Sequence, residues 1–216
     1  METKYNIPPE KNWFYVFVSA ILVFFGKIYF RLEVKGLENI PATGAVIVAP
    51  AHRSNLDPPA VGIMSSRQLH FMAKHTLFSV PILGAAIRKL NAFPVKRGAF
   101  DRTAMEYSFE LLRQGRPLLI FPEGTRSRDG LLQKPLAGVG MMVAKAKVPV
   151  VPCYIHGSYE AYPRKMKFPL PHKVTVIFGE KIDYSVLLKD ETINKETYER
   201  IANEIMEHIR KLIPAQ

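Results

Sequence analysis

The sequence has 216 residues and a mass of 24.5 kDa, which corresponds to one domain with a sizeable core. Its 48% hydrophobic residues exclude a disordered chain, and a mean hydropathy near zero excludes a polytopic membrane protein. The net charge of +11 indicates a polyanionic partner, and nucleic acid, an anionic membrane and phosphorylated substrates all fit it.

An uncharged, aromatic-rich run begins at residue 12 and ends at residue 26. It is shorter than the roughly 20 residues that a membrane-spanning helix needs, and aromatic side chains favour the membrane interface. We therefore predict that residues 1–35 form a hydrophobic helical anchor that enters one leaflet without crossing it. A buried core helix is the alternative. The side chains expected to contact lipid are Trp13, Phe14, Phe17, Phe24 and Phe25.

The remainder, residues 36–216, alternates strand and helix signals. Short apolar or β-branched runs predict strands at 44–50, 69–73, 92–95, 117–121, 148–155 and 173–178. Helical patterns predict helices at 58–66, 76–90, 102–114, 136–147 and 195–213. Several strands are apolar throughout, so both faces of the sheet should be covered. The predicted fold is a single α/β domain with a mostly parallel central sheet flanked by helices.

A histidine and an aspartate follow the first of these strands. Asp57 precedes Pro58, a pair typical of a helix start, so His52 should lie in the loop before that helix. A tight loop would bring the carboxylate to one imidazole nitrogen and leave the other to take a proton from a nucleophile. We predict that His52 is a general base oriented by Asp57. A plain loop histidine and a helix cap are the alternatives, and a Ser–His–Asp triad lacks the G-x-S-x-G pattern.

A second polar cluster, the FPEGTR run at residues 121–126, follows a later apolar strand. The chain also contains the H-x4-D pattern at 52–57, an FPVKRG run at 93–98 and a VPVVP run at 148–152. Taken together, these four blocks resemble the glycerolipid acyltransferase family, which includes the 1-acyl-glycerol-3-phosphate (lysophosphatidate) acyltransferases. They occur in the family's order and extend over about half of the chain.

The resemblance implies transfer of a fatty acyl group from acyl-CoA or acyl carrier protein to the free hydroxyl of lysophosphatidate, giving phosphatidate in phospholipid biosynthesis. His52 would deprotonate the hydroxyl for direct attack on the thioester, with Asp57 in support and no cofactor or metal. Glycerol 3-phosphate or another lysolipid is the alternative acceptor. Because thioester donors are cytosolic, we expect a monotopic or peripheral enzyme on the cytoplasmic face of a bacterial cell membrane.

Binding of the acceptor's phosphate requires cations and open backbone amides. The guanidinium of Arg126 offers two parallel donors, and neighbouring lysine and arginine side chains add charge. The family role of Glu123 is acceptor binding, through a glycerol hydroxyl or by holding Arg126, and a structural ion pair is an equal alternative. The predicted phosphate- and glycerol-binding residues are Lys96, Arg97, Gly98, Glu123, Gly124, Thr125 and Arg126.

The positive charge is concentrated in the part of the chain that carries the blocks, because residues 179–216 contain six basic and eight acidic side chains. A basic loop at 163–173, with Phe168 and Leu170 among its apolar side chains, suits an anionic membrane surface. A non-catalytic module that binds such a membrane explains the charge equally well, but it does not explain the pairing of His52 with Asp57. No nucleic-acid-binding motif and no metal-ligand spacing are present in the sequence.

Overall fold

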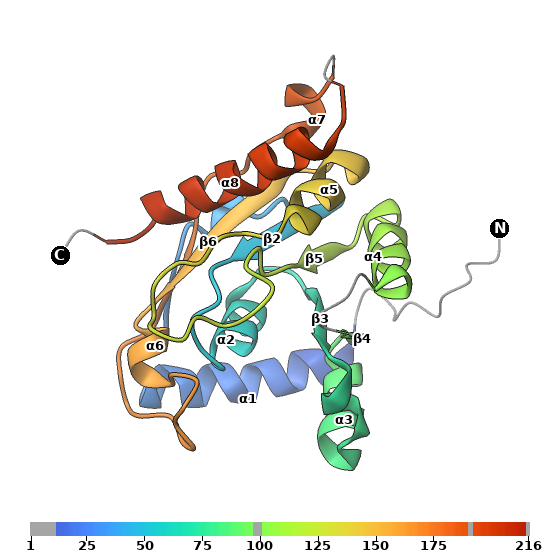
Figure 1. The fold of residues 1–216 in the computed structure, drawn as a ribbon. Helices are drawn as coiled ribbons and strands as arrows, with labels where there is room; N and C mark the ends of the chain where they lie inside the picture. Colours follow the sequence, from blue (N-terminus) through green and yellow to red (C-terminus); the bar gives the residue numbers. More distant parts are fainter. Residues whose placement is uncertain (1–11, 97–100, 190–191, 215–216) are drawn as a thin grey trace.

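The computed structural model describes residues 12–96, 101–189 and 192–214, and these residues form an α/β domain around one sheet. The sheet has seven strands in the order β1-β7-β6-β2-β5-β3-β4 (Figure 1). Five neighbouring strands, from β6 to β4, run parallel, while β7 pairs antiparallel with β6 and parallel with β1. The predicted mostly parallel sheet is therefore confirmed. The strands are β1 Glu33–Lys35, β2 Val46–Pro50, β3 His70–Lys74, β4 Ala92–Val95, β5 Pro117–Leu119, β6 Val150–His156 and β7 Thr175–Phe178.

Helices cover both faces of the sheet, as Figure 1 shows, with α5 and α8 on one face and α1 and α2 on the other. The reason is visible in β2, which is buried throughout. Ile47 and Ala49 pack into the core under α5 and α8, while Val46 and Val48 pack into the core beside α2. The helices are α1 Trp13–Tyr29, α2 Asp57–Met64, α3 Pro81–Lys89, α4 Arg102–Arg113, α5 Ala137–Ala146, α6 Ser158–Ala161, α7 Tyr184–Leu187 and α8 Lys195–Lys211, with 3-10 turns η1 Leu37–Asn39 and η2 His75–Ser79.

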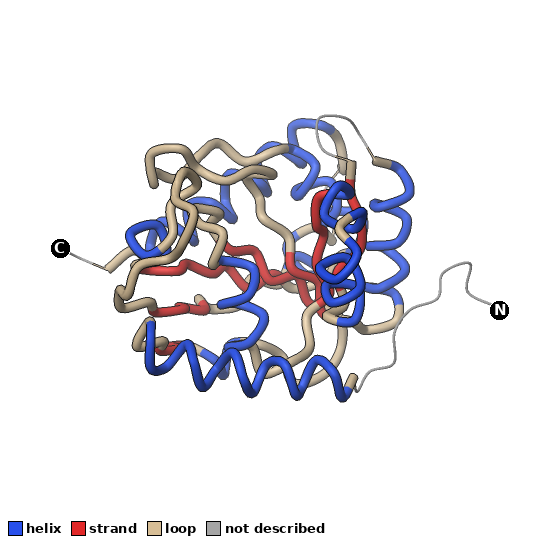
Figure 2. Tube along the Cα trace, turned by 90° about the horizontal axis from the view of Figure 1, so that it is seen from below, coloured by secondary structure: helices blue, strands red, loops and turns tan. Residues whose placement is uncertain are grey.

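Helix α1 lies along the domain (Figures 1 and 2). Asn12 caps its first turn, and the hydroxyl of Tyr15 donates to the carbonyl oxygen of Gly62 in α2 at 3.1 Å. Within α1 only Tyr15 and Gly26 are buried, so it is not the core helix of the alternative interpretation. In the described part of the chain, no helix is both long and apolar enough to cross a membrane. The five side chains predicted to contact lipid, Trp13, Phe14, Phe17, Phe24 and Phe25, are exposed.

Three local details differ from the predictions. The helix predicted at 76–90 is divided into η2 and α3, because Pro81 holds the preceding Val80 in an extended conformation with φ −81° and ψ 115°. Strand β1 was not predicted and belongs to the sheet, so the sheet includes the last three residues of the 1–35 segment. Residues 1–11 of that segment lie outside the described residues. Helices α6 and α7, four residues each, are too short to give a periodic pattern.

Candidate active site

Three of the four predicted blocks meet at the carboxyl-end edge of the sheet, while the VPVVP run at 148–152 covers the start of β6. Strands β2, β4 and β5 run parallel, and their carboxyl ends lead into His52, Lys96 and the FPEGTR turn respectively. Loops at this edge are where open α/β sheets place their ligands. Strand β6 runs in the same direction and brings Ser158, two residues after its end, to the same edge.

Asp57 is fully buried and folds back onto the loop that precedes it. Its Oδ2 lies 3.0 Å from His52 Nδ1 and accepts hydrogen bonds of 2.6 Å from the backbone N–H groups of Arg53 and Ser54. Its Oδ1 accepts the hydroxyl of Ser158 at 2.6 Å. The predicted contact between His52 and Asp57 is confirmed. Helix α2 begins at Asp57 rather than at Pro58, and the carboxylate therefore caps the loop instead of its own helix.

The His52 ring is held on two sides. It is 3% exposed, and it stacks on the Phe121 ring with centroids 3.8 Å apart and planes inclined by 22°. With Nδ1 directed to the Asp57 carboxylate, Nε2 is the nitrogen that can accept a proton from another molecule. The packing and the carboxylate together fix the orientation that a general base requires.

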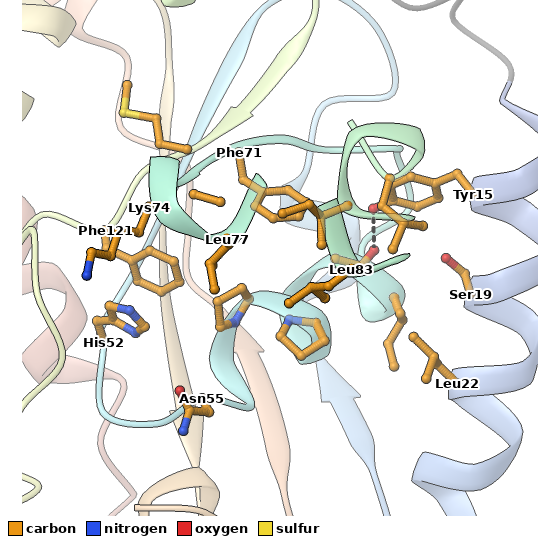
Figure 3. A pocket seen from close by; sticks show the side chains of 18 of the residues that line it. Tyr15, Ser19, Leu22, His52, Asn55, Phe71, Lys74, Leu77, Leu83 and Phe121 are labelled. Atoms are coloured by element: carbon orange, nitrogen blue, oxygen red, sulfur yellow. Dashed lines mark hydrogen bonds between the residues drawn. The ribbon is translucent and has the colours of Figure 1, made fainter. Parts of the chain in front are cut away.

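His52 borders two cavities. The larger, about 480 Å³, extends from His52 and Phe121 to Tyr15, Ser19 and Leu22 of α1 (Figure 3). Its walls are mainly apolar and come from α1, α2, β3, η2 and α3, and Arg126 is also part of the lining. The smaller cavity, about 230 Å³, contains Lys96 in its lining. The imidazole thus lies where an apolar chain and a charged group could both reach it.

Glu123 joins the two loops of the site. Its carboxylate accepts the backbone N–H of His52 at 3.0 Å and that of Gln133 at 3.3 Å. Glu123 is 3% exposed, and this burial, with a smaller contribution from the charge of Asp57, raises its pKa from 4.5 to about 7. The structure therefore gives Glu123 a positioning contact with the histidine loop that neither sequence interpretation included.

The remaining predicted ligands differ in their surroundings. Arg126 lines the larger cavity and donates to the side-chain oxygen of Asn55. Lys96 and Thr125 are exposed. The amide of Gly124, predicted to be open to an anion, instead donates to the Phe121 carbonyl at 3.0 Å, so that prediction is wrong. Gly124 is required by the turn itself, because its φ is +66° and a Cβ would lie 2.4 Å from Leu136 Cδ1. The predicted residues Arg97 and Gly98 lie outside the described residues.

Two residues of the site were not predicted. Ser158 binds Asp57 from the end of β6, and its only signal in the sequence was its position after an apolar strand. Arg53 is buried, donates from Nε to the Gly130 carbonyl at 2.6 Å and also donates to the Tyr154 hydroxyl. It stabilises the loop behind the site. In the part of the chain that is described, no three His, Cys, Asp or Glu side chains are grouped so that they could hold a metal ion.

Comparison with known proteins agrees with this arrangement. The chain is similar to a chloroplastic 1-acyl-sn-glycerol-3-phosphate acyltransferase of Brassica napus, with 31% identity over 77% of this chain and 50% of the relative. It is also similar to the 1-acyl-sn-glycerol-3-phosphate acyltransferase of Bacillus subtilis, with 31% identity over 58% of this chain and 63% of the relative. The chain spans about half the length of the chloroplast relatives that it matches.

A solved structure and a family model extend the comparison. The crystal structure of the 1-acyl-sn-glycerophosphate (LPA) acyltransferase PlsC from Thermotoga maritima superposes with a TM-score of 0.74 and 28% identity, covering 94% of this chain and 82% of the other. The family model described as Acyltransferase matches residues 31–156, the segment that contains the His52–Asp57 pair and the FPEGTR turn. On the extent of this match, the chain belongs to the acyltransferase family.

Proposed function

We propose that this protein acylates the free hydroxyl of lysophosphatidate from an acyl thioester and releases phosphatidate, as a step of phospholipid biosynthesis. The observation that carries the proposal is the buried His52–Asp57 pair at the end of an apolar cavity that Arg126 also lines. The names of the plant and bacterial relatives, both 1-acyl-sn-glycerol-3-phosphate acyltransferases, support this acceptor over other lysolipids. The donor is acyl-CoA or acyl carrier protein, and no cofactor or metal takes part.

In this reaction His52 acts as the general base. Its Nε2 takes the proton of the acceptor hydroxyl as the oxygen attacks the thioester carbonyl carbon. The C–S bond then breaks, and the leaving thiolate recovers the proton from the imidazolium. Asp57 stabilises that imidazolium through the 3.0 Å contact with Nδ1. Because the hydroxyl attacks directly, no acyl-enzyme forms, and Cys153, buried in β6, has no part in the reaction.

The two ends of the substrates match the two kinds of surface at the histidine. An acyl chain fits the larger cavity, whose lining is dominated by apolar side chains. The phosphate of the acceptor lies with Arg126 and Lys96, which line the larger and the smaller cavity respectively. The guanidinium fork of Arg126, oriented by Asn55, suits two phosphate oxygens.

Helix α1 is the proposed membrane contact. Its exposed aromatic side chains include Trp13, Phe17 and Phe24, with exposed fractions of 83%, 65% and 61%. Such rings favour the zone between lipid tails and headgroups. The enzyme is accordingly monotopic or peripheral, and we place it on the cytoplasmic face of a bacterial cell membrane, where thioester donors are available.

The test is His52→Ala in the full chain, with His208→Ala on α8, outside the lining of both cavities at His52, as the matched control. Mass spectrometry of products from lysophosphatidate, glycerol 3-phosphate and other lysolipids would be combined with vesicle sedimentation. We expect His52→Ala to lose acyl transfer by about a thousandfold or more while vesicle binding is unchanged. Retained activity would refute the general base, and acylation of a different acceptor alone would refute the substrate. Absence of any acyl transfer by the wild-type chain would favour the non-catalytic membrane module.

A further inference from the structure

Apart from Leu131, Leu136, Val186, Leu187 and Ile213, the large exposed apolar side chains of the described residues lie in three segments that are distant in sequence. In addition to α1, they occur in the η2–α3 segment and in the loop at 163–171. Ile82, at the start of α3, is 86% exposed, and Phe168, in the loop, is 78% exposed. The exposed apolar side chains of the two added segments are Leu77, Val80, Ile82, Leu83, Phe168 and Leu170. Large exposed apolar side chains that gather on one surface mark an interaction site.

Contacts at the two ends of α1 place these segments together. At its start, the Asn12 side chain donates to the Lys89 carbonyl of α3 at 2.6 Å, and Lys89 Nζ lies 5.3 Å from the centroid of the Phe14 ring. At its end, the Tyr29 hydroxyl donates to the Pro169 carbonyl at 3.0 Å. Figure 1 shows α1 and α3 at the lower side of the molecule, opposite α7 and α8. The three segments therefore form one face.

The charge of this face identifies its partner. Residues 12–29, 74–91 and 163–171 contain no aspartate or glutamate. Exposed basic side chains border the apolar ones in all three segments. They are Lys27, Lys74, Arg88, Lys89, Arg164, Lys165 and Lys167. Apolar side chains surrounded by exposed cations, without any acid, match a leaflet that contains anionic lipid.

We propose that the η2–α3 segment and the loop at 163–171 enter the same anionic leaflet as α1, so that the protein is held at three points. The larger cavity is lined by Ser19 and Leu22 of α1 and by Leu83 and Ile87 of α3. Lipid would thus pass between these two helices to reach His52. The route, unlike the three-point contact, rests on the proposed acyl transfer.

The single cysteine makes a direct measurement possible. Cys153 is fully buried, and burial raises the pKa of its thiol well above the usual range, so a folded chain resists labelling there. Ile82→Cys and Phe168→Cys would each be labelled with an environment-sensitive fluorophore. Val186→Cys on α7, where the native side chain is 69% exposed, is the matched control on the opposite side. Trp13, the one tryptophan of the sequence, reports α1 without any label.

Vesicles of phosphatidylcholine with phosphatidylglycerol, with and without brominated lipid, provide the readout. We expect blue-shifted and quenched emission from the labels at 82 and 168 and quenching of Trp13, with the label at 186 unchanged. Ile82→Asp, outside the cavity lining, should weaken vesicle binding on the order of tenfold, and Val186→Asp should not. Added salt should weaken binding of the wild type.

Several outcomes would overturn the proposal. If Trp13 is quenched while the labels at 82 and 168 stay aqueous, α1 alone enters the leaflet. A blue shift of the label at 82 without vesicles, together with a dimer in sedimentation, would assign the face to a second copy of the chain. An assay of acyl transfer in detergent micelles separates the two proposals. Absence of acyl transfer would refute the proposed activity, while the fluorescent labels would still show whether the three segments enter the leaflet.

Discussion

Replacement of Glu123 by glutamine tests whether burial of this carboxyl group governs the pH dependence of stability. Glu123 is 3% exposed and lies in the turn after β5, where its carboxyl group contacts the loop after β2. Burial raises its pKa from 4.5 to about 7. The folded chain therefore holds a proton on this group at pH values where the unfolded chain has released it.

The sign and size of the effect follow from linkage. Between pH 4.5 and 7 the native state binds more protons than the unfolded state, so the free energy of unfolding decreases as pH rises. The contribution is fully present below pH 4.5 and is lost as pH rises through about 7. Between pH 5 and pH 8 these two pKa values correspond to a loss of about 2 to 3 kcal/mol. Glu123→Gln cannot titrate, so it should not show this loss.

Urea unfolding followed by circular dichroism at pH 5, 6, 7 and 8 measures the difference, provided that wild type and variant have equal m-values. The free energy of unfolding of the wild type minus that of Glu123→Gln should decrease by about 2 to 3 kcal/mol across this range. Glu199→Gln, an exposed change on α8, controls for the loss of one carboxylate. Parallel curves for wild type and Glu123→Gln would refute the argument that Glu123 is protonated in the folded chain near neutral pH.

Three further substitutions test the site and its support. Ser158→Ala removes the 2.6 Å hydrogen bond to Asp57. In steady-state acyl transfer we expect kcat to be lower by about tenfold and KM to be unchanged. An equal change in kcat and KM would contradict a positioning role for Ser158. Arg126→Lys replaces the two parallel donors of the guanidinium by a point charge, so KM for lysophosphatidate should rise by about tenfold. An unchanged KM would exclude a contact between Arg126 and the phosphate. Gly140→Ala would place a Cβ 1.9 Å from the Tyr198 carbonyl oxygen, between α5 and α8. The free energy of unfolding measured in urea should therefore decrease by about 2 kcal/mol or more. Equal stability of variant and wild type would mean that the two helices separate freely.

The contact between His52 and Asp57 is predictable because everything it needs is local. Four residues separate the two side chains, and the helix that begins beside Pro58 leaves the preceding segment free to form a loop. The backbone N–H groups of Arg53 and Ser54 then donate to Asp57 Oδ2, so the same short loop supplies three of the partners of that oxygen. The apolar strand before His52 is equally local, and its predicted position agrees with β2.

Contacts between distant segments are not predictable in the same way. Ser158 lies 101 residues after its partner Asp57. Glu123 lies 71 residues after His52, whose backbone N–H donates to its carboxyl group. No periodic pattern in one sequence connects such positions. The direction of β7 is not predictable for a related reason. A short apolar run has the same composition whether it pairs parallel or antiparallel with β6.

The contacts of Glu123 also explain how an acidic residue can lie three positions before Arg126, the residue proposed to bind the phosphate. Its two oxygens accept the backbone N–H groups of His52 and Gln133, and burial favours its neutral form up to about pH 7. The carboxyl group therefore presents little negative charge to the cavity that Arg126 lines. One turn can thus carry two tasks, with Glu123 supporting the histidine loop and Arg126 attracting the anion. Below about pH 7 this acid therefore weakens the attraction between Arg126 and the proposed phosphate less than an ionised carboxylate would.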